Sequence, residues 1–268
     1  MVYTDWVEVF IQHLHLSQQI KFSLKGRYIM TKTVGCIFAD SMEYGPFLAR
    51  AEKLGGKQSI RRGNESVEIT LSEKGRTLRV IGVKCGIGKV NAASATAFLI
   101  ADDGVDFILN AGLSGAVHGL KREDMIAATT YIECDFDLTA IGYAPGVKAD
   151  GQKYLYEADR DLLGLALQSP GIIAARVGTG DIFLADPVKK DFFRSTFGIE
   201  SFDMETAAIA GVCDKLGVPM LSLRKISDDA DGDAYETYRE MNERQEACLT
   251  DLLFNILKRY LAADSLWK

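Results

Sequence analysis

The sequence is poor in histidine and has no closely paired cysteines, and these shortages exclude several kinds of protein. Its five cysteines are scattered over 268 residues without a CxxC pair. That spacing fits neither a disulfide framework nor a zinc site, and it predicts reduced thiols in a cytoplasmic protein. Only three histidines are present, and His13 and His15 alternate without a third ligand nearby. We therefore expect no metal site and no cofactor.

Long apolar runs and basic clusters are also missing. No stretch of 18 apolar residues occurs, so the sequence predicts no membrane-spanning helix. The formal net charge is −6 and no run of Lys and Arg is present, which argues against a nucleic-acid partner. The first 30 residues carry Asp5 and Glu8 and lack the apolar core of a secretion signal. A cytoplasmic protein without a membrane partner is the expectation.

Strand-like and helix-like segments alternate along the chain, with no linker or internal repeat between them. An apolar run over 33–39 predicts the first buried strand. The alternation predicts a single-domain three-layer α/β/α fold with a central mixed sheet, over residues 33–268. We expect residues 1–32 to form an N-terminal appendage outside this core, with an amphipathic helix in 4–22 and Met30 as an alternative start.

Two predicted helices bear on function. In 201–219 apolar residues recur at spacings of three and four, Gly217 is typical of a helix C-terminus, and Pro219 blocks continuation. Two carboxylates in 203–205 precede this small-residue helix, and a carboxylate that is buried there requires a partner or a ligand. A second apolar pattern predicts one long C-terminal helix over 236–262.

Glycines and carboxylates gather where the predicted strands end. In open α/β sheets ligands bind at the carboxyl ends of strands, in the loops that follow. These strand ends therefore predict an active site, and they are residues 40–43, 86–89, 110–115, 178–183, 203–205 and 224–228.

Two familiar motifs are incomplete. The stretch CGIGKVN contains GxGK but lacks the third glycine of a dinucleotide loop and the GK[ST] of a P-loop. An ordinary strand-to-helix turn is the favoured interpretation over a phosphate cradle. The stretch AGLSGA is GxSG, not GxSxG, and no histidine is placed to activate Ser114 as a nucleophile.

Three acids, Glu43, Glu205 and Asp228, fit one chemistry, although each alone also fits an ordinary helix-start or turn acid. Breaking the C–N bond of a nucleoside needs an acid that protonates the leaving base and a base that activates water. A third carboxylate can hold the ribose hydroxyls beside the developing positive charge. On this hypothesis Glu205 holds a ribose, and Met204 packs on the sugar face.

At these residues the sequence resembles the 5′-methylthioadenosine/S-adenosylhomocysteine nucleosidases, which belong to the nucleoside phosphorylase/nucleosidase superfamily. The resemblance covers residues 33–262 and rests on SFDMETAAIAGVCDKLGVPMLSLRKISDDADGDA, with CGIGKVNAASAT, ILNAGLSGAV, CDFDLTAIGY and TGDIF in the family's order. It implies the α/β/α fold of nucleoside phosphorylases and the hydrolysis of 5′-substituted adenine nucleosides. It also implies a homodimer, because a loop of the neighbouring subunit covers the pocket in this family.

The resemblance implies roles for individual residues. Glu43 resembles the residue that activates water, and Asp228 resembles the acid that protonates the purine. The other implied positions bind substrate. They are Glu205 and Met204 at the ribose, Ser227 and Arg224 supporting Asp228, Phe183 and Leu184 at the adenine, Ile87 at the 5′ group, Ser114 and Gly115 at the ribose-side strand end, and Ile141 and Tyr143 in the loop that covers the neighbour's pocket.

Other functions stay open at this point. A purine nucleoside phosphorylase needs arginines that hold phosphate, and the strand ends FADSMEYG and DFIL contain none, which favours water as the nucleophile. A futalosine-type nucleosidase or a nucleoside-binding relative without catalysis would use the same fold. The 5′ substituent is equally open between methylthio, homocysteinyl, plain deoxy and futalosine-type groups.

Overall fold

The structure is a computed structural model that describes residues 20–22, 28–244 and 247–267. Eleven strands in this part of the chain form one mixed sheet. They are β1 (Ile20–Phe22), β2 (Tyr28–Phe38), β3 (Lys57–Arg61), β4 (Asn64–Glu73), β5 (Arg76–Lys84), β6 (Phe107–Ala116), β7 (Met125–Glu133), β8 (Leu155–Glu157), β9 (Ile172–Thr179), β10 (Ser201–Asp203) and β11 (Met220–Asp228).

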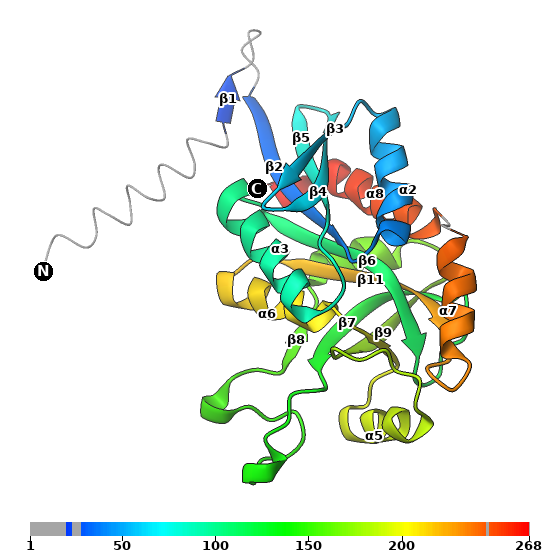
Figure 1. The fold of residues 1–268 in the computed structure, drawn as a ribbon. Coiled ribbons are helices and arrows are strands. Elements are labelled where there is room, and N and C mark those ends of the chain that lie inside the picture. The colour runs from blue at the N-terminus through cyan, green and yellow to red at the C-terminus, as the bar shows by residue number, and fades with distance from the viewer. Residues whose placement is uncertain (1–19, 23–27, 245–246, 268) are drawn as a thin grey trace, which may run out of the picture.

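The strand order is β10-β9-β7-β11-β6-β2-β5-β4-β3, and β10 pairs back onto β6 (Figure 1). The contacts of β2 with β5 and β6, and of β6 with β11, are parallel. Because of the additional β10–β6 pairing, the sheet curls on itself at one end, which the alternation of segments did not indicate. The carboxyl ends of β2, β6, β10 and β11 meet beside this closed part, where a ligand site is expected.

Helices cover both faces of the sheet, which confirms the predicted three-layer α/β/α arrangement (Figure 1). One face packs against α3 (Lys89–Asp103) and α6 (Thr206–Leu216), whose buried alanines allow a close approach. The other face packs against α2 (Ser41–Lys53), α4 (Arg160–Leu167) and α8 (Cys248–Ala262). The remaining helices are α5 (Pro187–Phe197) and α7 (Ala234–Glu243).

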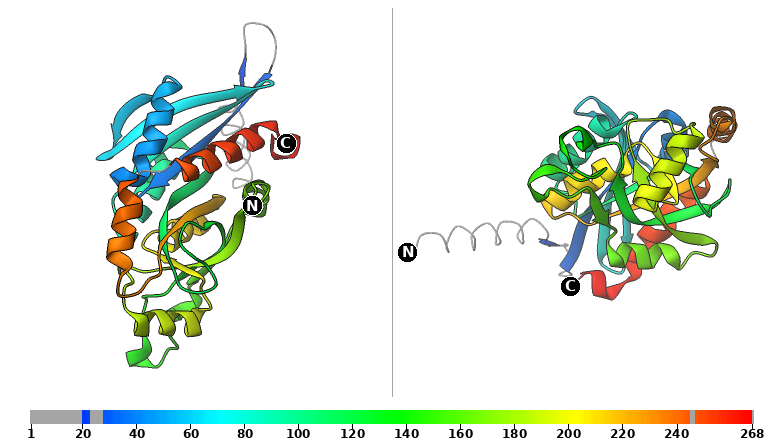
Figure 2. Two further views of the ribbon diagram at one scale, coloured as in Figure 1. Left: turned by 90° about the vertical axis from the view of Figure 1, so that its right-hand side faces the viewer. Right: turned by 90° about the horizontal axis from the view of Figure 1, so that it is seen from below.

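The prediction of one long C-terminal helix is wrong. The segment forms α7 and α8, which run in different directions (Figure 2). Helix α7 contacts β11 and α2 near the strand ends, whereas α8 lies across the face of the sheet against β4, β5, β6 and β11. A single straight helix cannot cover both surfaces, so tertiary packing overrides a helical pattern that continues through the break.

The predicted N-terminal boundary after residue 32 falls inside β2. This strand begins at Tyr28 and pairs with β5 from Met30 onwards, and Ile20–Phe22 form strand β1 rather than the end of a helix. The Lys32 ammonium donates to the Tyr260 hydroxyl at 3.0 Å, which ties this part of β2 to α8. The rest of the predicted appendage helix lies outside the described residues, and the division into two parts stays a prediction.

Candidate active site

A cavity of about 460 Å³ opens at the carboxyl ends of the central strands. Residues from all six predicted strand-end segments line it, which confirms that these segments meet. The predicted site residues in its wall are Glu43, Ile87, Ser114, Gly115, Phe183, Leu184, Met204, Glu205, Ser227 and Asp228.

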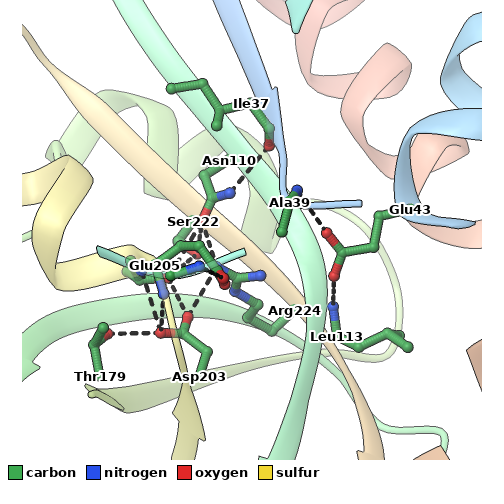
Figure 3. A network of polar contacts seen from close by, with 12 residues as sticks. Ile37, Ala39, Glu43, Asn110, Leu113, Thr179, Asp203, Glu205, Ser222 and Arg224 are labelled. Carbon is green, nitrogen blue, oxygen red and sulfur yellow. Dashed lines mark hydrogen bonds and ion pairs between the residues drawn. The ribbon is translucent and has the colours of Figure 1, made fainter. Parts of the chain in front are cut away.

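The carboxylate of Glu43 is held by two backbone amides. Asp40 caps α2 by accepting hydrogen bonds from the amides of Met42 and Glu43, so Glu43 stands in the first turn of the helix. Its Oε2 accepts from Ala39 N at 2.9 Å, and its Oε1 accepts from Leu113 N at 2.7 Å (Figure 3). The side chain thus bridges the ends of β2 and β6 in one fixed orientation.

Burial makes this carboxyl hard to ionise. Desolvation raises the pKa of Glu43 to about 8, and the charge of Arg224 opposes that rise. Gly112 explains how Glu43 and Arg224 come so close to each other. A Cβ atom at Gly112 would collide with both the Glu43 carboxylate and the Arg224 guanidinium. Gly112, the first glycine of AGLSG, is therefore required by close packing and not by a nucleophile motif.

The carboxylate of Asp203 has the partners within the protein that a buried carboxylate in 203–205 requires. Its Oδ1 accepts from the amides of Glu205 and Thr206 at 3.2 Å and from the Thr179 hydroxyl at 2.6 Å. Its Oδ2 lies 2.9 Å from Nη2 of Arg224 (Figure 3). Asp203 therefore caps the start of α6. The buried negative charge of its carboxylate and the buried positive charge of Arg224 compensate each other.

Glu205, by contrast, presents its carboxylate to the cavity. Its Oε1 accepts from Gly88 N at 2.9 Å, and its Oε2 lies 3.9 Å from Arg224. Burial raises the pKa of Glu205 to about 7, with the positive charge of Arg224 acting in the opposite direction. A carboxylate fixed this way at the wall can accept hydrogen bonds from a pair of ligand hydroxyls.

Asp228 lies at the end of β11, where a bulge between Ile226 and Asp228 interrupts the pairing with β6. Bulges of this kind re-aim side chains beside active sites, and here both Ser227 and Asp228 face the cavity. Asp228 accepts from the Ser227 hydroxyl at 2.6 Å and from Ala230 N at 2.9 Å. Burial raises the pKa of its carboxyl above the ordinary value, and the hydrogen bonds from Ser227 and Ala230 N oppose that rise.

The predicted support of Asp228 by Arg224 is wrong. The Arg224 side chain points toward Asn110, Thr206 and Asp203, donating to Asn110 Oδ1 at 2.6 Å (Figure 3). Arg224 pairs with Gly112 and Asp228 pairs with Gly115 on β6, which separates the two residues by about 10 Å along the strand axis. Arg224 belongs instead to the Glu205 and Glu43 end of the cavity.

Comparison with known proteins places this geometry in a family. Residues 33–262 match the family model described as "Phosphorylase superfamily". The 5′-methylthioadenosine/S-adenosylhomocysteine nucleosidase of Geobacillus sp. (strain WCH70) is 33% identical over 186 residues, 66% of this chain and 80% of that protein. The protein of the same name from Bacillus subtilis (strain 168) is 32% identical over 188 residues, 67% and 81% of the two chains. The chain belongs to this nucleosidase family of the phosphorylase superfamily.

Solved structures agree with the sequence relatives. Futalosine hydrolase of Helicobacter pylori strain 26695 superposes with a TM-score of 0.78 and 26% identity, over 85% of this chain and 98% of that one. The 5′-methylthioadenosine/S-adenosylhomocysteine nucleosidase of the same species, complexed with butyl-thio-DADMe-Immucillin-A, gives a TM-score of 0.77 and 26% identity, over 85% and 99%. The nucleoside phosphorylase-like α/β fold predicted for this chain is thereby confirmed.

An aromatic cluster closes one side of the nucleosidase cavity. The Phe183 ring meets Tyr238 edge-on at 5.5 Å and Tyr235 at 6.4 Å between ring centroids. Both tyrosines come from α7 and line the cavity, and sequence reasoning missed them because it placed them in a long amphipathic helix. The sequence signal that could have placed them at the cavity was their position soon after the acidic turn that follows β11.

The other predicted positions divide into two groups. Ser114 lines the cavity, and among the described residues its buried hydroxyl has no hydrogen-bond partner. Gly115 faces Asp228, where a Cβ atom would lie only 2.8 Å from its carboxylate. Ile141 and Tyr143 do not line this chain's cavity but lie exposed on the segment between β7 and β8, which projects from the body (Figure 1).

Within the described ranges, no group of three or more His, Cys, Asp or Glu side chains is arranged to hold a metal ion. No helix in the same part of the chain combines the length and apolar character needed to cross a bilayer.

Proposed function

We propose that this nucleosidase hydrolyses the N-glycosidic bond of 5′-substituted adenine nucleosides, 5′-methylthioadenosine and S-adenosylhomocysteine among them, and releases adenine. The observation that carries the proposal is one cavity walled by Glu43, Glu205 and Asp228, all with raised pKa values. The names of the relatives support the same reaction, as does a solved relative, at 26% identity and a TM-score of 0.77, with 5′-methylthioadenosine in its active site.

Asp228 serves as the general acid in this proposal. A purine leaves as a poor anion unless a ring nitrogen receives a proton, and such a proton transfer contributes roughly 10²–10⁴-fold to the rate. Burial raises the pKa of Asp228, which makes its protonated form more accessible, and the Ser227 hydroxyl and the Ala230 amide hold its two oxygens in place. Phe183 and Leu184, in the same wall, supply the apolar surface against which the adenine ring packs.

Glu43 serves as the general base. A water beside Oε1 would donate to Glu43 and attack the sugar carbon as the carboxylate takes up its proton. Nη1 of Arg224 is fully buried next to this carboxylate and has no hydrogen-bond partner among the described residues, so it can donate to the same water. Glu43 then takes up the proton of the water within the cavity, and the positive charge of Arg224 lies beside the water as it attacks.

Glu205 holds the ribose through its hydroxyls, and Met204 packs on the sugar. As the C–N bond stretches, the ribose gains positive charge, and a nearby carboxylate stabilises that charge more strongly in the transition state than in the ground state. The Arg224 contact at 3.9 Å and the Gly88 amide keep Glu205 in place without consuming all its acceptor capacity.

Adenine release in phosphate-free buffer tests the proposal. Purified protein is incubated with 5′-methylthioadenosine, with and without added phosphate, and adenine and the sugar product are quantified. Phosphate-independent release of adenine and free methylthioribose is expected, because no Lys or Arg stands among the described residues lining the cavity and Arg224, which lies behind Glu43, is already paired with Asp203. Release only with phosphate would instead identify a phosphorylase. Failure with this nucleoside but turnover of a futalosine-type nucleoside would move the assignment to that substrate.

The proposal includes a homodimer in the cytoplasm. Ile141 and Tyr143 are 70% and 38% exposed, and their projecting segment is suited to cover the pocket of a second copy. Five free cysteines fit a reducing compartment. Sedimentation of the wild type and of Ile141→Asp, with activity measured on both, tests the dimer; a monomeric and fully active wild type would refute it.

A further inference from the structure

Lys89, the last residue of the GxGK motif, has no part in the proposed catalysis. It is the first residue of α3, and its side chain is only 19% exposed. Its ammonium donates to Asp135 Oδ1 at 2.7 Å and to Glu133 Oε1 at 3.0 Å. Hydrogen bonds between charged groups are strong, so this side chain is fixed between two acids rather than free in solvent.

The two backbone amides at the end of the motif bind carboxylates from two other segments. Gly88 N donates to Glu205 Oε1 at 2.9 Å, and Lys89 N donates to Asp181 Oδ1 at 2.8 Å. Gly88 has a φ of 95°, and a Cβ atom there would lie 3.0 Å from Asp181 Oδ1. The second glycine of GxGK is therefore favoured by its backbone conformation and by the close approach of Asp181. Adjacent backbone positions thus join Glu205 to Asp181.

Asp181 connects the motif to the adenine side of the cavity. It directly precedes residues 182–184, which line the cavity on the side proposed for adenine. Asp181 N donates to Asp135 Oδ2 at 2.9 Å, so these two acids are neighbours. Lys89 contacts both of them, Asp181 through its amide and Asp135 through its ammonium. It therefore lies between the turn that holds Glu205 and the segment that meets the base.

The positive charge of Lys89 keeps these acids together. Three acids and two lysines meet in this network, namely Glu133, Asp135 and Asp181 with Lys89 and Lys148. Lys148 pairs with Glu133, whereas the cation paired with Asp135 is Lys89. Without Lys89, the neighbouring carboxylates of Asp135 and Asp181 would repel each other. Asp181 would then shift, together with the backbone amide that it binds at the start of α3.

We propose that Lys89 is a positioning residue that fixes Glu205 relative to the adenine-side segment 181–184, and that it thereby sets the recognition of the ribose hydroxyls. The inference rests on the proposed function, in which Glu205 binds those hydroxyls. Lys89 itself meets neither the substrate nor the reacting atoms. It acts through the Gly88 amide, which holds the Glu205 carboxylate, and through Asp181 at the start of the adenine-side segment.

The preference for a 3′ hydroxyl measures how precisely Glu205 is placed. Values of kcat/KM are measured for 5′-methylthioadenosine and for its 3′-deoxy analogue. The wild type is expected to favour the first by about tenfold or more, the effect of one hydrogen bond to a charged group. Lys89→Met keeps the apolar stem but removes the cation, and it should lower this preference by about tenfold. A general loss of folded protein would lower both values equally and leave the preference unchanged.

Two further variants test whether the charge of Lys89 is what matters. Lys89→Arg retains a cation that can bind the same acids, so it should keep most of the 3′ preference. Asp181→Asn, combined with Lys89→Met, removes the repulsion that the lost cation had compensated. The asparagine carbonyl can still accept from the backbone amide at position 89. The double variant should therefore regain the 3′ preference that Lys89→Met alone has lost.

Arg79 offers a matched control, because it is shared by Glu68 at 2.9 Å and Asp103 at 3.1 Å and is not among the described residues that line the cavity. Arg79→Met should leave the 3′ preference unchanged.

The inference would be overturned by an active wild type without a 3′ preference, by Lys89→Met with the preference of the wild type, or by a double variant that does not recover it. Absence of adenine release from 5′-methylthioadenosine by the wild type would instead refute the proposed function, and the inference with it.

Discussion

Nη2 of Arg224 lies 2.9 Å from Oδ2 of Asp203, and neither side chain is accessible to solvent beyond 1%. The same guanidinium reaches Glu205 and lies against Glu43 at Gly112. One cation therefore compensates the charge of a helix-capping acid and orients two acids of the cavity. The fold and the active site depend on the same buried pair.

Removing this cation should destabilise the protein severely. Arg224→Met leaves the Asp203 carboxylate buried without a counter-charge, and breaking such pairs costs about 3–5 kcal/mol in the free energy of unfolding. Urea denaturation measures that loss. As a control, Arg50→Met breaks the exposed pair of Arg50 with Asp251 and should cost no more than about 1 kcal/mol. Equal costs for the two variants would contradict the role given to Arg224.

Glu43→Gln should separate binding from turnover. Glutamine preserves the shape of the side chain but cannot accept a proton from water, so kcat should fall by roughly 10²–10⁴-fold while substrate still binds. Adenine release measures kcat, and calorimetric titration measures binding. Glu52→Gln, on the exposed part of the same helix, should behave as the wild type. A near-normal rate for Glu43→Gln would assign the base to another residue.

The strand-end cluster could be predicted from the sequence because its physical cause is local. Glycines and acids that follow apolar runs mark loops at strand ends, and parallel strands bring those loops to one edge of the sheet. That reasoning found six segments that all reach the cavity wall, with Glu43, Glu205 and Asp228 among them, whereas positions such as Ile87 and Leu184 were implied by the family resemblance. The catalytic roles of the three acids stay predictions until the variants are measured.

The partners of Arg224 and the break between α7 and α8 could not be predicted in this way. Met241 and Cys248 are seven residues apart, so the apolar pattern continues in phase through a change of helix direction. Likewise, nothing in the spacing of β11 says whether Arg224 pairs with Asp203 or supports Asp228. Both outcomes depend on contacts between segments that are distant in sequence. The cavity positions of Tyr235 and Tyr238 were missed for the same reason.

Asp228→Asn should lose much more activity on a substrate whose leaving group must be protonated than on one whose leaving group departs as a stable anion. On 5′-methylthioadenosine the rate should fall by roughly 10²–10⁴-fold. On 4-nitrophenyl riboside, whose phenolate leaves without protonation, the same variant should lose far less. Asp191→Asn, at an exposed position of α5, serves as the control. Equal losses on both substrates would mean that Asp228 positions the substrate and does not protonate it.

A protein that begins at Met30 should fold and keep its activity. Strand β2 then retains its pairs with β5 from Met30 to Phe38, together with the Lys32 contact to Tyr260. Thermal unfolding and adenine release are compared with those of the full chain. A loss of both stability and activity would mean that residues 1–29 belong to the working core.

Glu43→Gln should also change how stability depends on pH. The folded protein holds the Glu43 proton up to a pKa of about 8, whereas the unfolded chain releases it near the ordinary value of 4.5. Between these values the folded state binds more protons, so rising pH favours unfolding and the wild type loses stability through this window. Glutamine carries no titrating proton. The variant should therefore match the wild type near pH 4.5 and exceed it by on the order of 4 kcal/mol at pH 8.

Urea denaturation of both proteins at pH 5, 6.5 and 8, without ligand, measures this difference. Glu52→Gln again serves as the control, because its exposed position should give the same pH dependence as the wild type. A stability difference that does not grow with pH would show that Glu43 is ionised in the folded protein at neutral pH. A difference between the variant and the wild type that grows with pH would mean that the buried Glu43 carboxyl lowers the stability of the protein. Its desolvation then opposes folding in the pH range where Glu43 must ionise to act as a base.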